Sequence, residues 1–165
     1  MISNSVKSDV INSIISVAYY WMGEQNKSCS LSIIKLLYQL KLTTVQGKKV
    51  DDLYNDYNTI FKDNKTMHST LTIPKQYDTD EKQLMWVAGT VILNLFNSGN
   101  FELGYTQLMD MAIDWNDLYV YVINSLKQQP FKNEIADWLV THMLMAYDLL
   151  GQKEIESLGY KIQKI

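Results

Sequence analysis

The chain of 165 residues contains no arginine, so all of its positive charge comes from 15 lysines. The planar guanidinium of arginine is the group that grips phosphate and carboxylate bidentately. With 18 acidic residues and a formal net charge of −3, its absence argues against nucleic-acid binding, anionic-membrane binding and phosphate-clamping enzymes. The composition therefore excludes these classes without identifying the function.

The sequence is also poor in cysteine, proline, glycine and long apolar runs. The one cysteine, Cys29, excludes an internal disulfide and fits a reducing cytoplasm. Two prolines, seven glycines and 47% hydrophobic residues exclude disordered and fibrous classes. The longest apolar run, 84–96, is shorter than the roughly 20 residues of a membrane span, and residues 1–9 do not resemble a signal peptide. We therefore expect one cytoplasmic domain over 1–165, with no membrane contact.

Apolar residues recur every three or four positions along most of the chain, which predicts α-helices. The expected helices cover about 4–22, 31–38, 50–61, 80–97, 101–113, 114–128, 131–150 and 152–158. The fold class is therefore all-α, a single compact bundle of seven to eight helices built from αα-hairpins. The helices at about 80–97 and 131–150 are apolar around most of their circumference, so we expect both at the centre of the bundle.

Several polar residues predict where these helices begin. Ser30 is a plausible N-cap for the second helix. Thr79 or Asp78 is a plausible N-cap for the long helix expected at about 80–97. Residues 43–49, which contain Gly47, are expected to form a loop before the third helix. The helical pattern stops over about 63–79, a long irregular connection that is often functional and has room for a short extended piece.

No stretch of the chain carries the motif of a known family, and no catalytic or zinc-binding pattern is present. The two histidines are expected to be structural or solvated, with His142 packed in the core and His68 exposed in the long connection. We therefore expect no enzymatic activity, no catalytic residue, no metal site and no cofactor.

Three aspartates, Asp110, Asp114 and Asp117, follow the spacing that places residues on one face of a helix, and Glu102 lies nearby in the sequence. One interpretation is that Asp114 caps a new helix and the other acids are simply solvated. A second is an acidic docking surface for a basic partner, and a third is a divalent-metal or acid–base site. Three further acids, Asp51, Asp52 and Asp56, are expected at the start of the third helix, where the helix dipole favours negative charge.

Trp115 stands between acidic residues at an expected helix start, a composition typical of an interface anchor, whereas the other tryptophans fit core positions. Tyr119 and Tyr121 follow on opposite sides, so one of them is expected to be exposed with Trp115. The predicted partner-binding residues are Glu102, Asp110, Asp114, Trp115, Asp117 and Tyr121.

Small size, acidic balance and the lack of catalytic motifs together favour a protein-binding inhibitor. The most concrete hypothesis is an immunity protein or antitoxin that covers the active site of a basic toxin. One alternative is a phage- or virus-encoded inhibitor of a host protein. Another is a small-molecule sensor or enzyme with a pocket between the central helices, gated by residues 63–79.

Overall fold

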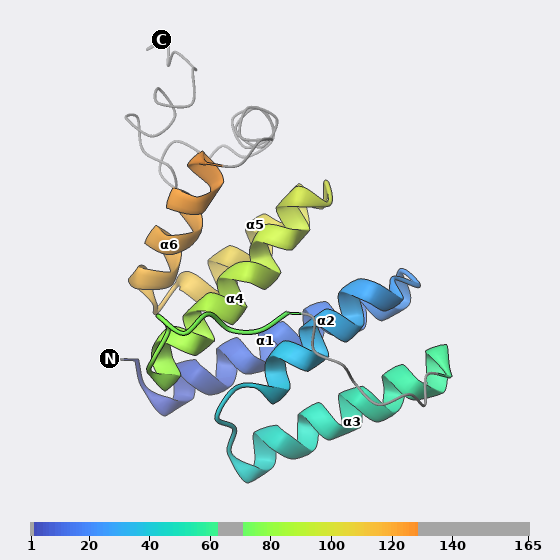
Figure 1. The fold of residues 1–165 in the computed structure, drawn as a ribbon. Helices are drawn as coiled ribbons and strands as arrows, with labels where there is room; N and C mark the ends of the chain where they lie inside the picture. Colours follow the sequence, from blue (N-terminus) through green and yellow to red (C-terminus); the bar gives the residue numbers. More distant parts are fainter. Residues whose placement is uncertain (1, 63–70, 129–165) are drawn as a thin grey trace.

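The computed structural model describes residues 2–62 and 71–128, which form a bundle of six α-helices without strands (Figure 1). In order, the helices are α1 (Asn4–Gly23), α2 (Lys27–Tyr38), α3 (Thr44–Phe61), α4 (Asp80–Asn97), α5 (Phe101–Ala112) and α6 (Asn116–Lys127). The all-helical prediction is confirmed for these residues. The helices expected over 131–150 and 152–158 lie outside them, so the total of seven to eight helices and the central apolar pair stay predictions.

The turn between α1 and α2 is tighter than expected. Gln25 has a positive φ of 59° and reverses the chain, after which the Asn26 side chain accepts from the Cys29 N–H at 2.9 Å and caps α2. The prediction of Ser30 as N-cap is therefore wrong. Ser30 is buried inside α2, and its hydroxyl donates to the Asn26 carbonyl at 2.8 Å, because the tight turn starts the helix one turn earlier.

The start of α3 also differs from the prediction. Residues 43–49 are not a loop, because α3 begins at Thr44 and Gly47 lies in its first turns. The Thr43 side chain accepts from the Gln46 N–H, and the Gln46 side chain accepts from the Thr43 N–H at 2.9 Å. This reciprocal capping box satisfies two N–H groups that have no partner within the helix. It offsets the cost of placing Gly47 in the helix.

The fourth helix begins and ends where the sequence predicted. Thr79 caps it by accepting from the Lys82 N–H at 3.2 Å, and acidic residues occupy its first turn. Residues 71–79 before it contain neither helix nor strand, as expected for that part of the long connection. The Gln39 side chain holds this segment, donating to the Leu71 carbonyl at 2.8 Å and accepting from the Ile73 N–H at 3.0 Å.

The last two described helices start without side-chain caps. Gly99, with φ 83°, turns the chain after α4, a left-handed conformation that favours glycine. Asn100 and Trp115 occupy the N-cap positions of α5 and α6, and neither side chain makes a capping hydrogen bond.

The core runs through the bundle, with α3 at one edge and α6 at the other (Figure 1). Helix α4 contacts α1, α2, α5 and α6, whereas α3 packs on α1 and α2. The largest fully buried side chains are Tyr57, Phe96, Ile14, Met22, Ile34, Leu36, Leu37, Leu53, Ile92, Leu95, Leu108 and Leu118. Within the part of the chain that the structure describes, no helix is long and apolar enough to cross a membrane.

Candidate functional site

Three of the predicted site residues surround the turn between α5 and α6. Asp110 lies in the last turn of α5, Asp114 in the connection and Asp117 in the first turn of α6, and all three are exposed. The expected break between two helices is confirmed, so the three carboxylates do not share one helical face. Asp114 does not cap α6, because Trp115 is the N-cap residue. The bend spreads the negative charges over a corner of the molecule.

Trp115 is not exposed, and this part of the prediction is wrong. Its side chain is only 3% exposed and belongs to the core, whereas Ile113, two residues earlier, is 77% exposed. The buried residues near the end of α5, Leu108 and Met111, are three positions apart, as the helical period requires. Ile113 follows only two positions later and therefore falls outside that period. The exposed apolar residue at this corner is therefore Ile113. The break in the period was the sequence signal for it.

We use the name acidic corner for five exposed residues: Asp110, Ile113, Asp114, Asp117 and Val120. A shallow hollow of about 360 Å³ adjoins them, between the start of α4 and the start of α6. Its lining includes Glu81, Lys82, Met85, Trp115, Asp117, Val120 and Tyr121. The structure therefore brings Trp115, Asp117 and Tyr121 together, with Trp115 in the wall of the hollow rather than on the surface.

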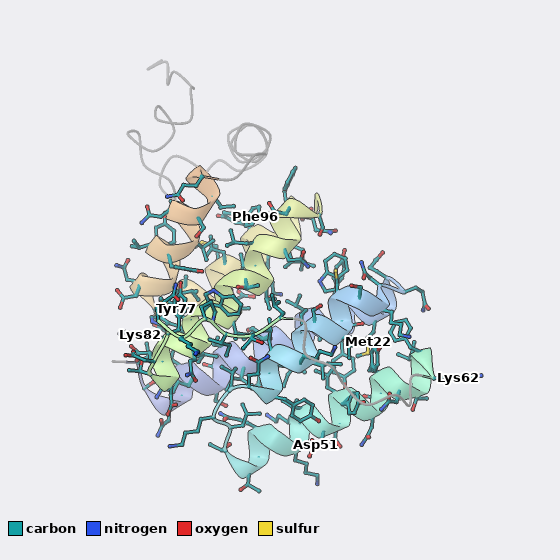
Figure 2. The ribbon with its side chains drawn as sticks, in the orientation of Figure 1. Met22, Asp51, Lys62, Tyr77, Lys82 and Phe96 are labelled. Atoms are coloured by element: carbon teal, nitrogen blue, oxygen red, sulfur yellow. The ribbon has the colours of Figure 1, made fainter. Side chains whose placement is uncertain are left out.

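Tyr121 is held by neighbours in the protein. Its ring packs so closely on Gly89 of α4 that a β-carbon there would overlap the Tyr121 ring carbons. Burial, followed by a hydrogen bond with Tyr77, raises the pKa of Tyr121 to about 12. Tyr77 lies in the segment just before α4, close to Lys82 at the start of that helix in Figure 2, and its ring centroid is 6.1 Å from that of Trp86. Tyr121 therefore links α6 to α4 and to that segment.

Glu102 does not belong to the acidic corner. It lies in the first turn of α5, eight residues before Asp110, which corresponds to about 12 Å along a helix that rises 1.5 Å per residue. Here it lines a separate shallow recess with Tyr20 and Asn100, whose side chains are joined by a 2.6 Å hydrogen bond. A docking surface at the corner therefore does not need Glu102.

The acids of α3 are not at a helix start, so the dipole explanation for them is wrong. Asp51 and Asp56 instead accept hydrogen bonds from exposed tyrosines: Tyr38 donates to Asp51 at 2.6 Å, and Tyr19 to Asp56 at 2.5 Å. Burial, the hydrogen bond and the nearby carboxylates raise the pKa of Tyr19 to about 12. The pKa of Tyr38 rises for the same reasons. These bonds attach α3 to α1 and α2, with Asp51 visible on α3 in Figure 2.

Residues that could support catalysis or metal binding are sparse in the described chain. In 2–62 and 71–128 no three histidine, cysteine or acidic residues are grouped closely enough to hold a metal ion. His68 and His142 lie outside these residues. Cys29 is half-buried, with its Sγ 3.5 Å from the Asn94 amide nitrogen of α4.

The chain matches no protein-family model, no curated protein and no solved structure.

Proposed function

We propose that the protein is an acidic protein-binding inhibitor, most concretely an immunity protein or antitoxin that neutralises a basic toxin by covering its active site. The observation that carries the proposal is the acidic corner, where an isoleucine exposed at 77% stands among three exposed aspartates. Among the described residues it is the most exposed large hydrophobic side chain. Covering an exposed apolar side chain with a partner lowers the free energy of the complex.

The three aspartates around Ile113 are suited to attracting a basic partner and to orienting it. Asp110, Asp114 and Asp117 take part in no salt bridge among those of the described residues. Exposed charges of one sign accelerate encounter with an oppositely charged partner and fix its register, more than they add affinity. A basic cleft would therefore be drawn to the corner, and Ile113 would provide apolar contact once docked.

The buried residues behind the corner would keep its shape. Trp115 is part of the core, and Tyr121 is fixed by Gly89 and Tyr77. A surface that is already ordered loses little conformational entropy on binding. This role differs from the anchor role predicted for Trp115 and Tyr121, since both would act by supporting the surface.

The test is capture of a basic protein from the source lysate, supplemented with the product of the neighbouring gene. Three baits are compared: the wild-type chain, the triple variant D110K/D114K/D117K, and the control triple D9K/E24K/D52K. The control replaces exposed acids elsewhere and makes the same change in net charge. We expect the wild-type chain and the control to retain one basic protein at low salt, and the corner variant to lose it.

A second variant separates charge from apolar contact. Ile113→Ala leaves all charges in place, so it should weaken binding at both low and moderate salt. The contribution of the aspartates to binding should instead fade with salt, because exposed charges are screened beyond about 10 Å at 0.1 M. Equal binding by the wild-type chain and both triple variants would place the docking surface elsewhere. Equal loss in both triples would indicate attraction by net charge alone.

A further inference from the structure

A third cavity has more positive than negative side chains in its lining. It is about 590 Å³ and is enclosed by the first turns of α1 and α3, the connection between α2 and α3, and the start of α4. These segments meet at one end of the bundle (Figure 1). Its volume falls within the roughly 300–1,000 Å³ typical of small-molecule sites. We call it the lysine pocket.

The floor of the lysine pocket is hydrocarbon. Ile11, Leu40 and Leu84 line it, and each is at most 9% exposed, so their packing is fixed by the core. Leu42 adds a half-buried side chain. None of the described lining residues is aromatic, so the pocket offers no surface on which a nucleobase would stack.

Three lysines, Lys7, Lys41 and Lys49, stand around this floor, with Asp80 as the one carboxylate among the described lining residues. Lys41 lies 3.9 Å from Asp80 and both are well exposed, so this pair cancels charge but adds little stability. Lys49 donates to the Asn12 side chain at 3.1 Å, which joins α3 to α1. The pocket therefore keeps a positive excess in a chain whose net charge is −3.

The two helix starts nearest these lysines add to the positive potential. Neither α1 nor α3 has an acidic residue in its first turn, so the positive ends of both dipoles are uncompensated there. Helix α4 differs, since Asp80 and Glu81 occupy its first turn and Glu81 accepts from the Ile2 N–H at 2.7 Å. The side formed by Lys7 and Lys49 therefore has two helix starts without acids, whereas Asp80 and Glu81 stand on the side formed by α4.

We propose that the lysine pocket binds a small amphiphilic anion, namely a carboxylate with a short alkyl chain. The lysines would hold the carboxylate at the rim as point charges, and the hydrocarbon floor would cover the chain. Without arginine the rim has no bidentate fork, and the pocket lacks a stacking surface, so a nucleotide fits it poorly. This site is separate from the acidic corner and independent of the proposed function.

The test uses the full chain with octanoate as probe, monitored by calorimetry and by NMR shifts of the lining residues. Two controls separate the parts of octanoate: acetate has the carboxylate without the long alkyl chain, and 1-octanol has the alkyl chain without the charge. We expect saturable binding of octanoate, with shifts centred on Ile11 and Leu84, and at least tenfold weaker binding of either control. No saturable octanoate binding, or equal affinity for 1-octanol, would overturn the proposal.

Neighbouring lysines of α3 provide a matched pair of variants. Lys49 lines the pocket, whereas Lys48, which is also exposed and lies one residue earlier, does not. Lys49→Gln should weaken octanoate about two- to fivefold, the effect of losing one exposed charge contact, and Lys48→Gln should leave it unchanged. The combined K7Q/K49Q variant should lose about tenfold. Equal effects of Lys48→Gln and Lys49→Gln would mean that octanoate responds only to net charge, which would overturn the site.

Discussion

The lysine pocket and the acidic corner carry opposite charge, and their helices begin in different ways. At the pocket, α1, α3 and α4 all start with a serine or threonine whose side chain accepts a backbone hydrogen bond. At the corner, α6 starts without a side-chain cap, and the turn before it exposes Ile113. The helix starts at the pocket are therefore stabilised by local hydrogen bonds, whereas the helix start at the corner depends on the core behind it.

This difference shows that a net charge of −3 describes neither region. The lysines of the pocket lie on α1, on α3 and in the connection between α2 and α3, whereas the aspartates of the corner lie around the turn between α5 and α6, so each region presents its own field to solvent. Because exposed charges are screened within about 10 Å at 0.1 M salt, a partner senses the local group rather than the sum. Partners of opposite sign can therefore be considered for the two regions.

The largest contrast in exposure is between Ile113 of the acidic corner and Trp115, which lies buried behind it. Trp115→Ala removes a large side chain that is 3% exposed and should lower the free energy of unfolding by about 3–5 kcal/mol. Ile113→Ala removes a side chain that is 77% exposed and should change it by less than about 0.5 kcal/mol. Urea unfolding followed by circular dichroism measures both. Similar losses in the two variants would mean that Ile113 is covered by other parts of the protein.

The support behind the corner can be broken at Gly89. Gly89→Ala places a β-carbon against the Tyr121 ring, an overpacking cost of about 1–3 kcal/mol, partly offset by alanine's helix preference of about 1 kcal/mol. We expect a net destabilisation in urea unfolding. Gly47→Ala is the matched control, because nothing lies within 4 Å of a β-carbon there, and it should be neutral or stabilising. A neutral Gly89→Ala would show that Tyr121 moves aside freely.

The helices of the described chain were largely predictable, because their apolar residues repeat with strict helical spacing. Errors arose where two local signals competed. Asn26 and Ser30 are both good N-cap residues, and only the backbone turn at Gln25 decides between them. Gly47 suggested a loop, but the capping box of Thr43 and Gln46 outweighs one glycine.

The candidate site was predicted in part. The aspartates of the corner were identified from spacing and charge, which a sequence records directly. Trp115 was misplaced because flanking aspartates suggest exposure, whereas its large apolar ring is drawn into the core. The lysine pocket was not predicted, since Lys7 is more than 30 residues from Lys41 and Lys49 and joins them only through the packing of α1 against α3.

The capped helix starts predict a smaller effect at the pocket. Thr43→Ala removes the side-chain acceptor of the capping box and should cost about 1 kcal/mol in urea unfolding. Thr44→Ala changes the neighbouring exposed threonine, which is inside the helix, and should cost much less. Equal losses would indicate that the two methyl groups, rather than the cap, stabilise the start of α3.

The last comparison concerns alkaline stability and Tyr121, which lies behind the acidic corner. Tyr121 has a pKa of about 12 in the folded protein, above its ordinary value of about 10, so the folded state keeps a proton that the unfolded state loses between these values. Stability from this group is therefore complete below about pH 10 and lost as the pH rises toward 12. Tyr121→Phe removes the proton, so its stability should fall less between pH 8 and 11.5.

Tyr19 provides the same comparison away from the corner, because its pKa of about 12 arises from burial and from Asp56 on α3. Tyr19→Phe should also reduce the alkaline loss, while Tyr121→Phe alone should remove the hydrogen bond that links α6 to Tyr77. Each variant is compared with the wild-type chain at the same pH, so the difference between their urea midpoints isolates each tyrosine. If Tyr121→Phe lost as much stability as the wild-type chain on alkaline titration, the hydroxyl would be solvated and the link from α6 to Tyr77 would be absent in solution.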